Sequence, residues 1–281
     1  GNLNIRDYDS LAALTGALEQ SISGDQPLQR VLTALRDNTR PAVVPEKLDD
    51  KTRAEAQAGP PWHLLNRLGH EFATENSALE EQKDKGSLLQ AVYQQLTELH
   101  RYLLARQNAP VPGKSALKAV QLRLDQNSSD PIFATRQMAK TLPVPLNRWV
   151  GKLAEQAWHV VTIEAVHYME LDWRENVVKT FTTQLADKYP FNPRSKEDAS
   201  LDAFERFFKP GGVLDAFYQQ NLKLFVENNQ GLKGGDNVVI RNDVLIQLNT
   251  AQKIRDIFFS PQQGHGVQFA VETVAPSGNK R

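Results

Sequence analysis

The fold is decided by the stretch LNRWVGKLAEQAWHVVTIEAVHYMELDWRENVVKTFTTQLADKY, which covers residues 146–189 and contains no proline. Apolar residues recur along it at helical spacing: Leu146, Trp149, Val150, Leu153, Ala157, Val161, Tyr168, Leu171, Val178, Phe181 and Leu185. As a single α-helix it would be about 60 Å long, at about 1.5 Å per residue. The stripe is too charged for a membrane span and is not a strict heptad, so it predicts a long backbone helix, either straight or kinked.

Shorter helical patterns flank this stretch on both sides. Residues that favour helix N-caps stand at Asp9 or Ser10, Asp130, Ser200 and Asn242. Turns that contain proline or glycine separate the patterns, as in residues 189–193. The predicted helices cover residues 10–22, 27–35, 62–72, 86–107, 114–124, 130–140, 200–208, 213–226 and 242–259.

The fold class expected from these patterns is mainly α, an elongated multi-helix bundle with one long central helix. Near the end of the chain, Val267, Phe269 and Val271 follow one another at strand periodicity. Because no partner strand lies nearby in sequence, we expect an orphan strand from a truncated β domain. The predicted domains are an N-terminal helical hairpin, a linker or loop with four prolines, a main helical domain and the start of that β domain: residues 1–38, 39–61, 62–260 and 261–281.

The overall composition excludes several classes of function. Lys plus Arg and Asp plus Glu both number 33, so the total charge favours neither nucleic acid nor an anionic membrane surface. The absence of cysteine excludes disulfides, thiolate metal sites and a cysteine nucleophile. No apolar run approaches the roughly 18 residues of a membrane span. The chain opens at Gly1 without an export signal, and we expect any anchor or signal to lie upstream.

Motifs for nucleotide or hydrolytic chemistry are incomplete. Gly113-Lys114-Ser115 is like the end of a phosphate-binding loop, but Asn108 stands where that motif requires its first glycine. The segment also follows a predicted helix, whereas a phosphate-binding loop follows a strand. No Gly-x-Ser-x-Gly elbow is present, which argues against an α/β-hydrolase. These residues predict no cofactor.

One constellation of histidine and glutamate leaves a metal site as an alternative. Glu164 and His167 lie three residues apart on one helix face, and His159 lies eight residues before His167. Di-iron bundles use such a pair, but they need a second one and two further inward glutamates, and no second Glu-x-x-His occurs. His63 and His70, seven residues apart, are no more persuasive. The simpler interpretation is surface or partly buried histidines, and no metal ligand is assigned.

Aromatic residues crowd into a short segment of the chain. Either they fill a core where helices cross, or they form an exposed patch for a partner, and the sequence leaves both open. Asp202 and Asp215 lie among them and are interpreted as helix-end caps or partners of an arginine rather than general acids. We predict no catalytic residue. The aromatic residues are Phe204, Phe207, Phe208, Phe217, Tyr218 and Phe225.

Five segments carry a resemblance to a known family. In order, they are Leu142-Pro-Val-Pro-Leu146 with Arg148-Trp149, Lys188-Tyr-Pro-Phe191 with Asn192-Pro193, Phe204-Glu-Arg-Phe-Phe208, Pro210-Gly-Gly-Val-Leu-Asp215 with Phe217, and Ile254-Arg-Asp-Ile-Phe-Phe259. Their order and spacing across about residues 85–271 resemble the C-terminal periplasmic region of the IcmF/TssM family. The resemblance is to an enteric-type member of that family. These are the inner-membrane core proteins of type VI secretion systems. Lys188 stands where the family usually has arginine.

The resemblance implies a non-enzymatic structural component of the type VI secretion trans-envelope complex. It implies the periplasmic part of a bacterial inner-membrane protein, a scaffold that links the inner-membrane complex to a TssJ-like outer-membrane lipoprotein. A DotU-like inner-membrane protein, reached through the full-length chain, and further copies of the protein are the other implied partners. In the family the lipoprotein contacts a β-rich domain beyond the aromatic-rich helices, so partner-binding residues stay unassigned. Two alternatives remain: a periplasmic adaptor that recruits a cell-wall-remodelling enzyme, and a helical-bundle metal-binding protein.

Overall fold

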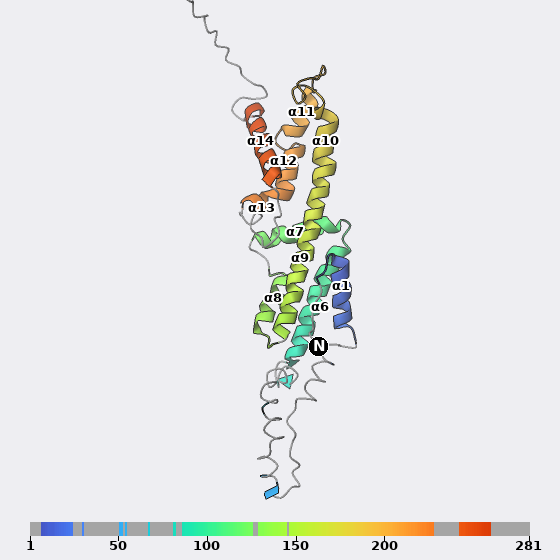
Figure 1. Cartoon of the computed structure of the whole chain (residues 1–281), viewed down its shortest axis with the longest axis vertical. Coiled ribbons are helices and arrows are strands. Elements are labelled where there is room, and N and C mark those ends of the chain that lie inside the picture. Colours follow the sequence, from blue (N-terminus) through green and yellow to red (C-terminus); the bar gives the residue numbers. More distant parts are fainter. Residues whose placement is uncertain are drawn as a thin grey trace, which may run out of the picture. The chain divides into compact units, whose positions relative to one another are not determined.

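The computed structural model describes residues 7–24, 30, 51–52, 54, 67, 81–82, 86–125, 129–144, 146–227 and 242–259. These residues are mostly helical (Figure 1), which confirms the predicted mainly α class. The chain divides into two compact units, Gly1–His167 and Tyr168–Arg281, and the division falls within helix α9. The predicted domain boundaries and the predicted orphan strand lie outside the described residues, as do the predicted helices 27–35 and 62–72 apart from residues 30 and 67. All of these stay predictions.

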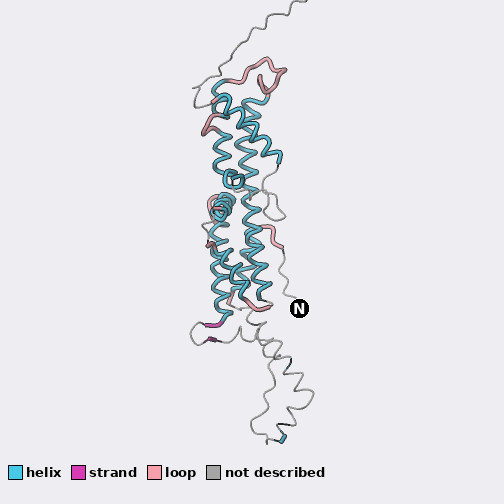
Figure 2. The backbone as a smooth tube through the Cα atoms, turned by 90° about the vertical axis from the view of Figure 1, so that its left-hand side faces the viewer, coloured by secondary structure: helices cyan, strands magenta, loops and turns pink. Residues whose placement is uncertain are grey.

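The first unit is built around helix α6, Leu88–Gln107. Helices α1 (Leu11–Ile22) and α8 (Pro131–Thr141) pack against it. Helix α7, Pro112–Leu124, runs crosswise to α6 in both views (Figures 1 and 2). Before α6, the two-residue strands β1 (Glu81–Gln82) and β2 (Gly86–Ser87) pair antiparallel. Fully buried leucines and valines form the core of the unit: Leu14, Leu18, Val92, Leu96, Leu99, Leu103 and Val150.

Side-chain caps begin the helices where the sequence predicted them. Ser10 Oγ accepts a hydrogen bond from Ala13 N at 3.3 Å at the start of α1. Asp130 Oδ1 accepts one from Phe133 N at 2.8 Å at the start of α8. In the second unit, Ser200 Oγ accepts one from Ala203 N at 3.2 Å. Each of these bonds satisfies a backbone N–H that has no partner inside its own helix.

The second unit contains the end of α9 (Leu146–Asp172), followed by two π-helical segments, η1 and η2, on either side of the short α10. Helix α11 packs against α12, η2 and α14, and α12 also packs against η1. The bounds are η1 Trp173–Val178, α10 Lys179–Phe181, η2 Thr182–Ala186, α11 Leu201–Phe208, α12 Val213–Phe217, η3 Tyr218–Leu222, α13 Lys223–Glu227 and α14 Asn242–Phe258.

The π-helical segments change which residues share the buried side of this stretch. Met169, Val177 and Leu185 are 5%, 2% and 1% exposed, and Trp173 and Phe181 between them are half-buried. These five residues are spaced by four. In an ideal α-helix, at about 100° per residue, Met169 and Leu185 would lie about 160° apart. A π turn is closed by i→i+5 hydrogen bonds and therefore contains more residues than an α-helical turn. The π turns thus keep the five residues of this row on one side of the helix.

The predicted stripe is therefore wrong at two positions. Leu171 is 54% exposed and Val178 is 37% exposed, although an uninterrupted α-helix would place both on the face of Leu185. That face would also carry Arg174, three residues after Leu171 and four before Val178. Burying an unpaired guanidinium is costly, whereas the row spaced by four contains no charged residue. The position of Arg174 thus favours the π turns, because they leave its charged side chain exposed.

Substitution of neighbouring residues tests this register. Met169→Ala is expected to lower the free energy of unfolding by about 2–5 kcal/mol, because it removes a buried side chain. Leu171→Ala is the matched control and is expected to change it by less than about 0.5 kcal/mol, because it shortens an exposed one. Urea denaturation of both variants measures the difference. Equal losses in the two would contradict the π-helical register.

Candidate functional site

Most of the predicted aromatic cluster lies in the core of the second unit. Phe207, Phe208, Phe217 and Phe225 are 4%, 5%, 6% and 2% exposed, and Phe204 is half-buried. The four buried rings confirm the interpretation as core. They also exclude an exposed docking patch made of the whole cluster.

Rings from distant segments complete this aromatic core, and the sequence did not place them there. Phe191, in the turn after η2, has its ring centroid 5.3 Å from that of Phe181 and 5.9 Å from that of Phe208. Phe204 lies 5.1 Å from Phe258 at the end of α14. Such edge and offset contacts add to the free energy of burial. No local pattern predicted these contacts, because the rings come from separate segments of the chain.

An apolar groove of about 480 Å³ opens beside these rings. Its walls are formed by residues of η1 and α10, by the rings of Phe191 and of Phe207 and Phe208 in α11, by Leu214 of α12, and by residues of α14 between Ile246 and Ile254. None of its lining residues is charged, and only Gln247 and Thr250 are polar. The Thr250 hydroxyl donates to the Ile246 carbonyl at 3.0 Å. The groove can accommodate an uncharged apolar group, but it contains no general acid or base.

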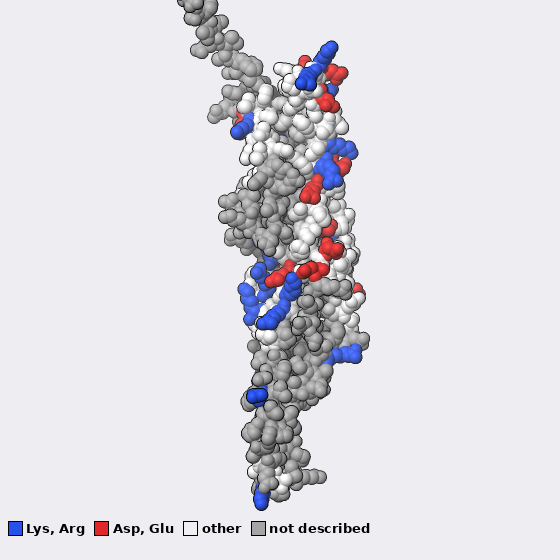
Figure 3. All heavy atoms as spheres, viewed as in Figure 1, with Lys and Arg blue, Asp and Glu red and all other residues white. Residues whose placement is uncertain are grey.

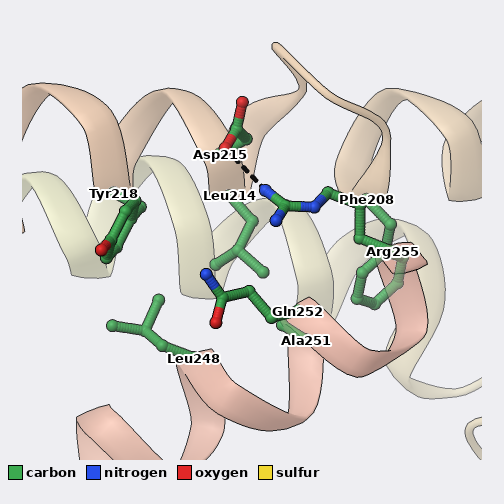
Figure 4. Close-up of a pocket in the computed structure, with 8 residues that line it drawn as sticks. All are labelled: Phe208, Leu214, Asp215, Tyr218, Leu248, Ala251, Gln252 and Arg255. Carbon is green, nitrogen blue, oxygen red and sulfur yellow. Dashed lines mark hydrogen bonds and ion pairs between the residues drawn. The ribbon is translucent and has the colours of Figure 1, made fainter. Parts of the chain in front are cut away.

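A smaller pocket next to it holds an ion pair (Figure 4). Arg255 of α14 points at Asp215 of α12, and their Nη1 and Oδ1 atoms lie 3.0 Å apart. Asp215 Oδ2 also accepts from Gly211 N at 2.8 Å. The volume of about 20 Å³ has room for about one water molecule. Asp215 is thus the arginine partner that the sequence predicted, while Asp202 is exposed in the first turn of α11.

A buried amide joins α9 to η3, and no local sequence pattern predicted it. Asn221 is 3% exposed, and its Nδ2 donates to Asp172 Oδ2 at 2.7 Å. Asn176 Nδ2 donates to the other oxygen, Oδ1, at 2.5 Å. Burial raises the pKa of Tyr168, and the nearby Asp172 carboxylate raises it further. The carboxylate is held by amide donors, so its role here is structural.

Two arginines of the first unit stack on aromatic rings. The guanidinium of Arg123 lies 4.2 Å from the ring centroid of Trp158, and that of Arg106 lies 3.2 Å from that of Tyr102. Burial lowers the pKa of both arginines and raises that of Tyr102. Arginine stays charged at any physiological pH, so these contacts serve packing.

The residues considered for metal or nucleotide chemistry remain scattered. Glu164 is half-buried and His167 is exposed on α9. Among the described residues, no group of three His, Cys, Asp or Glu side chains is arranged to share a metal ion. Gly113-Lys114-Ser115 lies in the first turn of α7, directly after α6, so a helix precedes it. His63 and His70 lie outside the described residues.

Comparison with known proteins relates the chain to type VI secretion. Residues 164–263 match the family described as "Type VI secretion protein IcmF helical domain". The type VI secretion system component TssM1 of Pseudomonas aeruginosa is 33% identical over 92 residues, which are 31% of this chain and 8% of that protein. Among the described residues, no helix has the length and apolar character needed to cross a bilayer.

Two solved structures share the fold. One is a chain of a "Type VI secretion system membrane core complex", with a TM-score of 0.60 and 20% identity, covering 91% of this chain and 51% of that one. The other is a chain of a "Type VI membrane complex", with a TM-score of 0.60 and 21% identity, covering 94% and 50%. The chain therefore spans about half the length of these solved chains.

Removal of the ion pair tests the role of Asp215. Asp215→Ala is expected to destabilise the protein by about 1.5–3 kcal/mol, because Arg255 loses a charged hydrogen-bond partner. Asp202→Ala removes an exposed carboxylate and is expected to cost less than about 1 kcal/mol. Urea denaturation of the two variants provides the comparison. A loss for Asp202→Ala as large as that for Asp215→Ala would contradict the assignment.

Two glycine substitutions are expected to act in opposite directions. A Cβ on Gly212, between α11 and α12, would stand 2.6 Å from the Arg206 carbonyl oxygen, so Gly212→Ala is expected to cost about 1–3 kcal/mol. At Gly16 in α1 nothing lies within 4 Å, and Gly16→Ala is expected to stabilise by about 0.5–1 kcal/mol. The melting temperatures of the two variants show whether each substitution stabilises or destabilises the protein. A stabilised Gly212→Ala protein would disprove the close approach of the turn.

Proposed function

The chain belongs to the IcmF/TssM family, as its five segments predicted, and we propose that it is a non-enzymatic structural component of a type VI secretion membrane complex. The observation that carries the proposal is the match of residues 164–263 to the IcmF helical domain. The helical core and apolar groove of the second unit support it, because they offer surfaces for packing and no reactive group.

The finer part of the proposal concerns location and partners. We propose a periplasmic scaffold that links the inner-membrane complex to a TssJ-like outer-membrane lipoprotein. Its other partners would be a DotU-like inner-membrane protein, through the full-length protein, and further copies of itself. The chain spans about half the length of the related solved chains. We propose that the lipoprotein contacts mainly the β-rich domain that the family resemblance implies.

Two sets of substitutions in the full-length protein separate a scaffold from a site of chemistry. Phe207→Ala with Phe208→Ala opens the aromatic core, and each truncation costs about 3–5 kcal/mol. We expect this pair to abolish both co-purification of the membrane partners and release of a secreted substrate. Glu164→Gln with His167→Gln removes the metal-like constellation, and we expect both readouts to stay at the wild-type level.

The second pair of substitutions makes the proposal falsifiable. If Glu164→Gln with His167→Gln abolished secretion while the membrane partners still co-purified, the chain would have a chemical role. Elemental analysis of the purified chain is an independent control. A stoichiometric metal ion, or hydrolysis of ATP by the isolated chain, would also contradict a purely structural role.

A further inference from the structure

Charge is unevenly distributed along the chain, although its total is zero. Between residues 111 and 152, seven cationic residues accompany only two acidic ones. The cations are Lys114, Lys118, Arg123, Arg136, Lys140, Arg148 and Lys152, and the acids are Asp125 and Asp130. This local excess of positive charge is hidden in the overall balance.

Two of these cations are engaged within the first unit. Arg123 lies 3.8 Å from Asp130 and stacks on Trp158, and Lys152 lies 3.1 Å from Asp7. The other five are exposed: Lys114, Lys118, Arg136, Lys140 and Arg148. In the part of the chain that the structure describes, none of these five forms an ion pair. In Figure 3, Lys and Arg side chains lie in the region of α8, beside Asp and Glu side chains.

Exposed apolar side chains occupy the same segment. Leu122 and Phe133 are 51% and 40% exposed. On α7, Lys114, Lys118 and Leu122 follow at intervals of four and share one face. On α8, Phe133 is followed on its face by Arg136 and Lys140, at intervals of three and four. Each helix thus presents, on its outer side, two exposed cations that form no ion pair with a described residue and one exposed apolar side chain. Lys140 Nζ also donates a hydrogen bond to Gln137 Oε1 at 3.2 Å.

We propose that the outer faces of α7 and α8 bind the surface of an anionic phospholipid bilayer. The lysine and arginine side chains would meet lipid phosphates, and Leu122 and Phe133 would enter the boundary between headgroups and acyl chains. Long cationic side chains suit this setting, because their apolar stems can follow the apolar surface while the charge stays in water.

The arrangement fits a lipid surface better than a helix of a protein partner. A partner helix is typically held in a hydrophobic groove. The apolar groove and the small pocket described above both lie in the second unit. The faces of α7 and α8 carry apolar side chains singly among exposed cations, which suits a fluid and anionic partner. This contact goes beyond the proposed scaffold role, which concerns protein partners.

Vesicle sedimentation tests the proposal on the whole 281-residue chain. The chain is expected to sediment with vesicles of phosphatidylglycerol and phosphatidylcholine, but not with vesicles of phosphatidylcholine alone. A variant with Lys114→Gln, Lys118→Gln, Arg136→Gln and Lys140→Gln is expected to lose about fivefold in partitioning per charge, and more than about 100-fold in total.

A matched variant controls for total charge. Arg174→Gln, Arg194→Gln, Lys196→Gln and Lys209→Gln remove the same four charges from exposed positions of the second unit. This variant is expected to bind within about threefold of the original chain, since its four substitutions lie outside the faces of α7 and α8 that are proposed to meet the lipid. Circular dichroism of both variants verifies that they are folded.

Three outcomes would overturn the proposal: no binding to anionic vesicles, equal binding to neutral vesicles, or equal losses in the two charge variants. Leu122→Ser with Phe133→Ser provides a second measure. Because salt screens the charges, this pair is expected to weaken binding most at high ionic strength. The readout involves only lipid and the purified chain, so its failure would leave the proposed scaffold function untouched.

Discussion

The second unit depends on the uncharged row that runs from Met169 through Val177 to Leu185. Its spacing of four residues does not match the α-helix, so the backbone adopts π turns where the row must stay buried. The rest of the unit follows from this choice. Trp173 and Phe181, members of the same row, provide the rings against which Phe217 and Phe207 pack. In a strictly α-helical segment, Trp173 and Phe181 would no longer point to the same side of the helix.

The sequence predicted local features of the fold well and distant contacts poorly. Ser10, Asp130 and Ser200 cap helices where expected, because a cap is determined within three residues of itself. The register beyond residue 168 was missed, since a periodicity count assumes a uniform helix. The hydrogen bond from Asn221 to Asp172 spans 49 residues, and no local pattern announces such a pair.

The candidate site shows the same division between local and distant information. Composition indicated that the aromatic residues matter, and the sequence left Asp215 as either a helix-end cap or a partner of an arginine. Which rings are buried required the three-dimensional arrangement, because Phe204 and Phe208 lie on the same helix yet differ in exposure. Likewise, the balanced total of charges hid the cationic outer faces of α7 and α8, since a sum over the chain carries no positions.

Apolar burial and polar pairing contribute differently to the second unit: burial stabilises it, and pairing determines the register of its helices. The hydrophobic effect has no direction, so the aromatic core alone would tolerate α14 displaced by a turn against α11 and α12. The Asp215–Arg255 pair joins α12 to α14 at one position, with both side chains mostly buried. A displaced helix would separate these two charges, at a cost of about 1.5–3 kcal/mol. We infer that burial supplies most of the stability and the ion pair selects the register, which suits the proposed structural role.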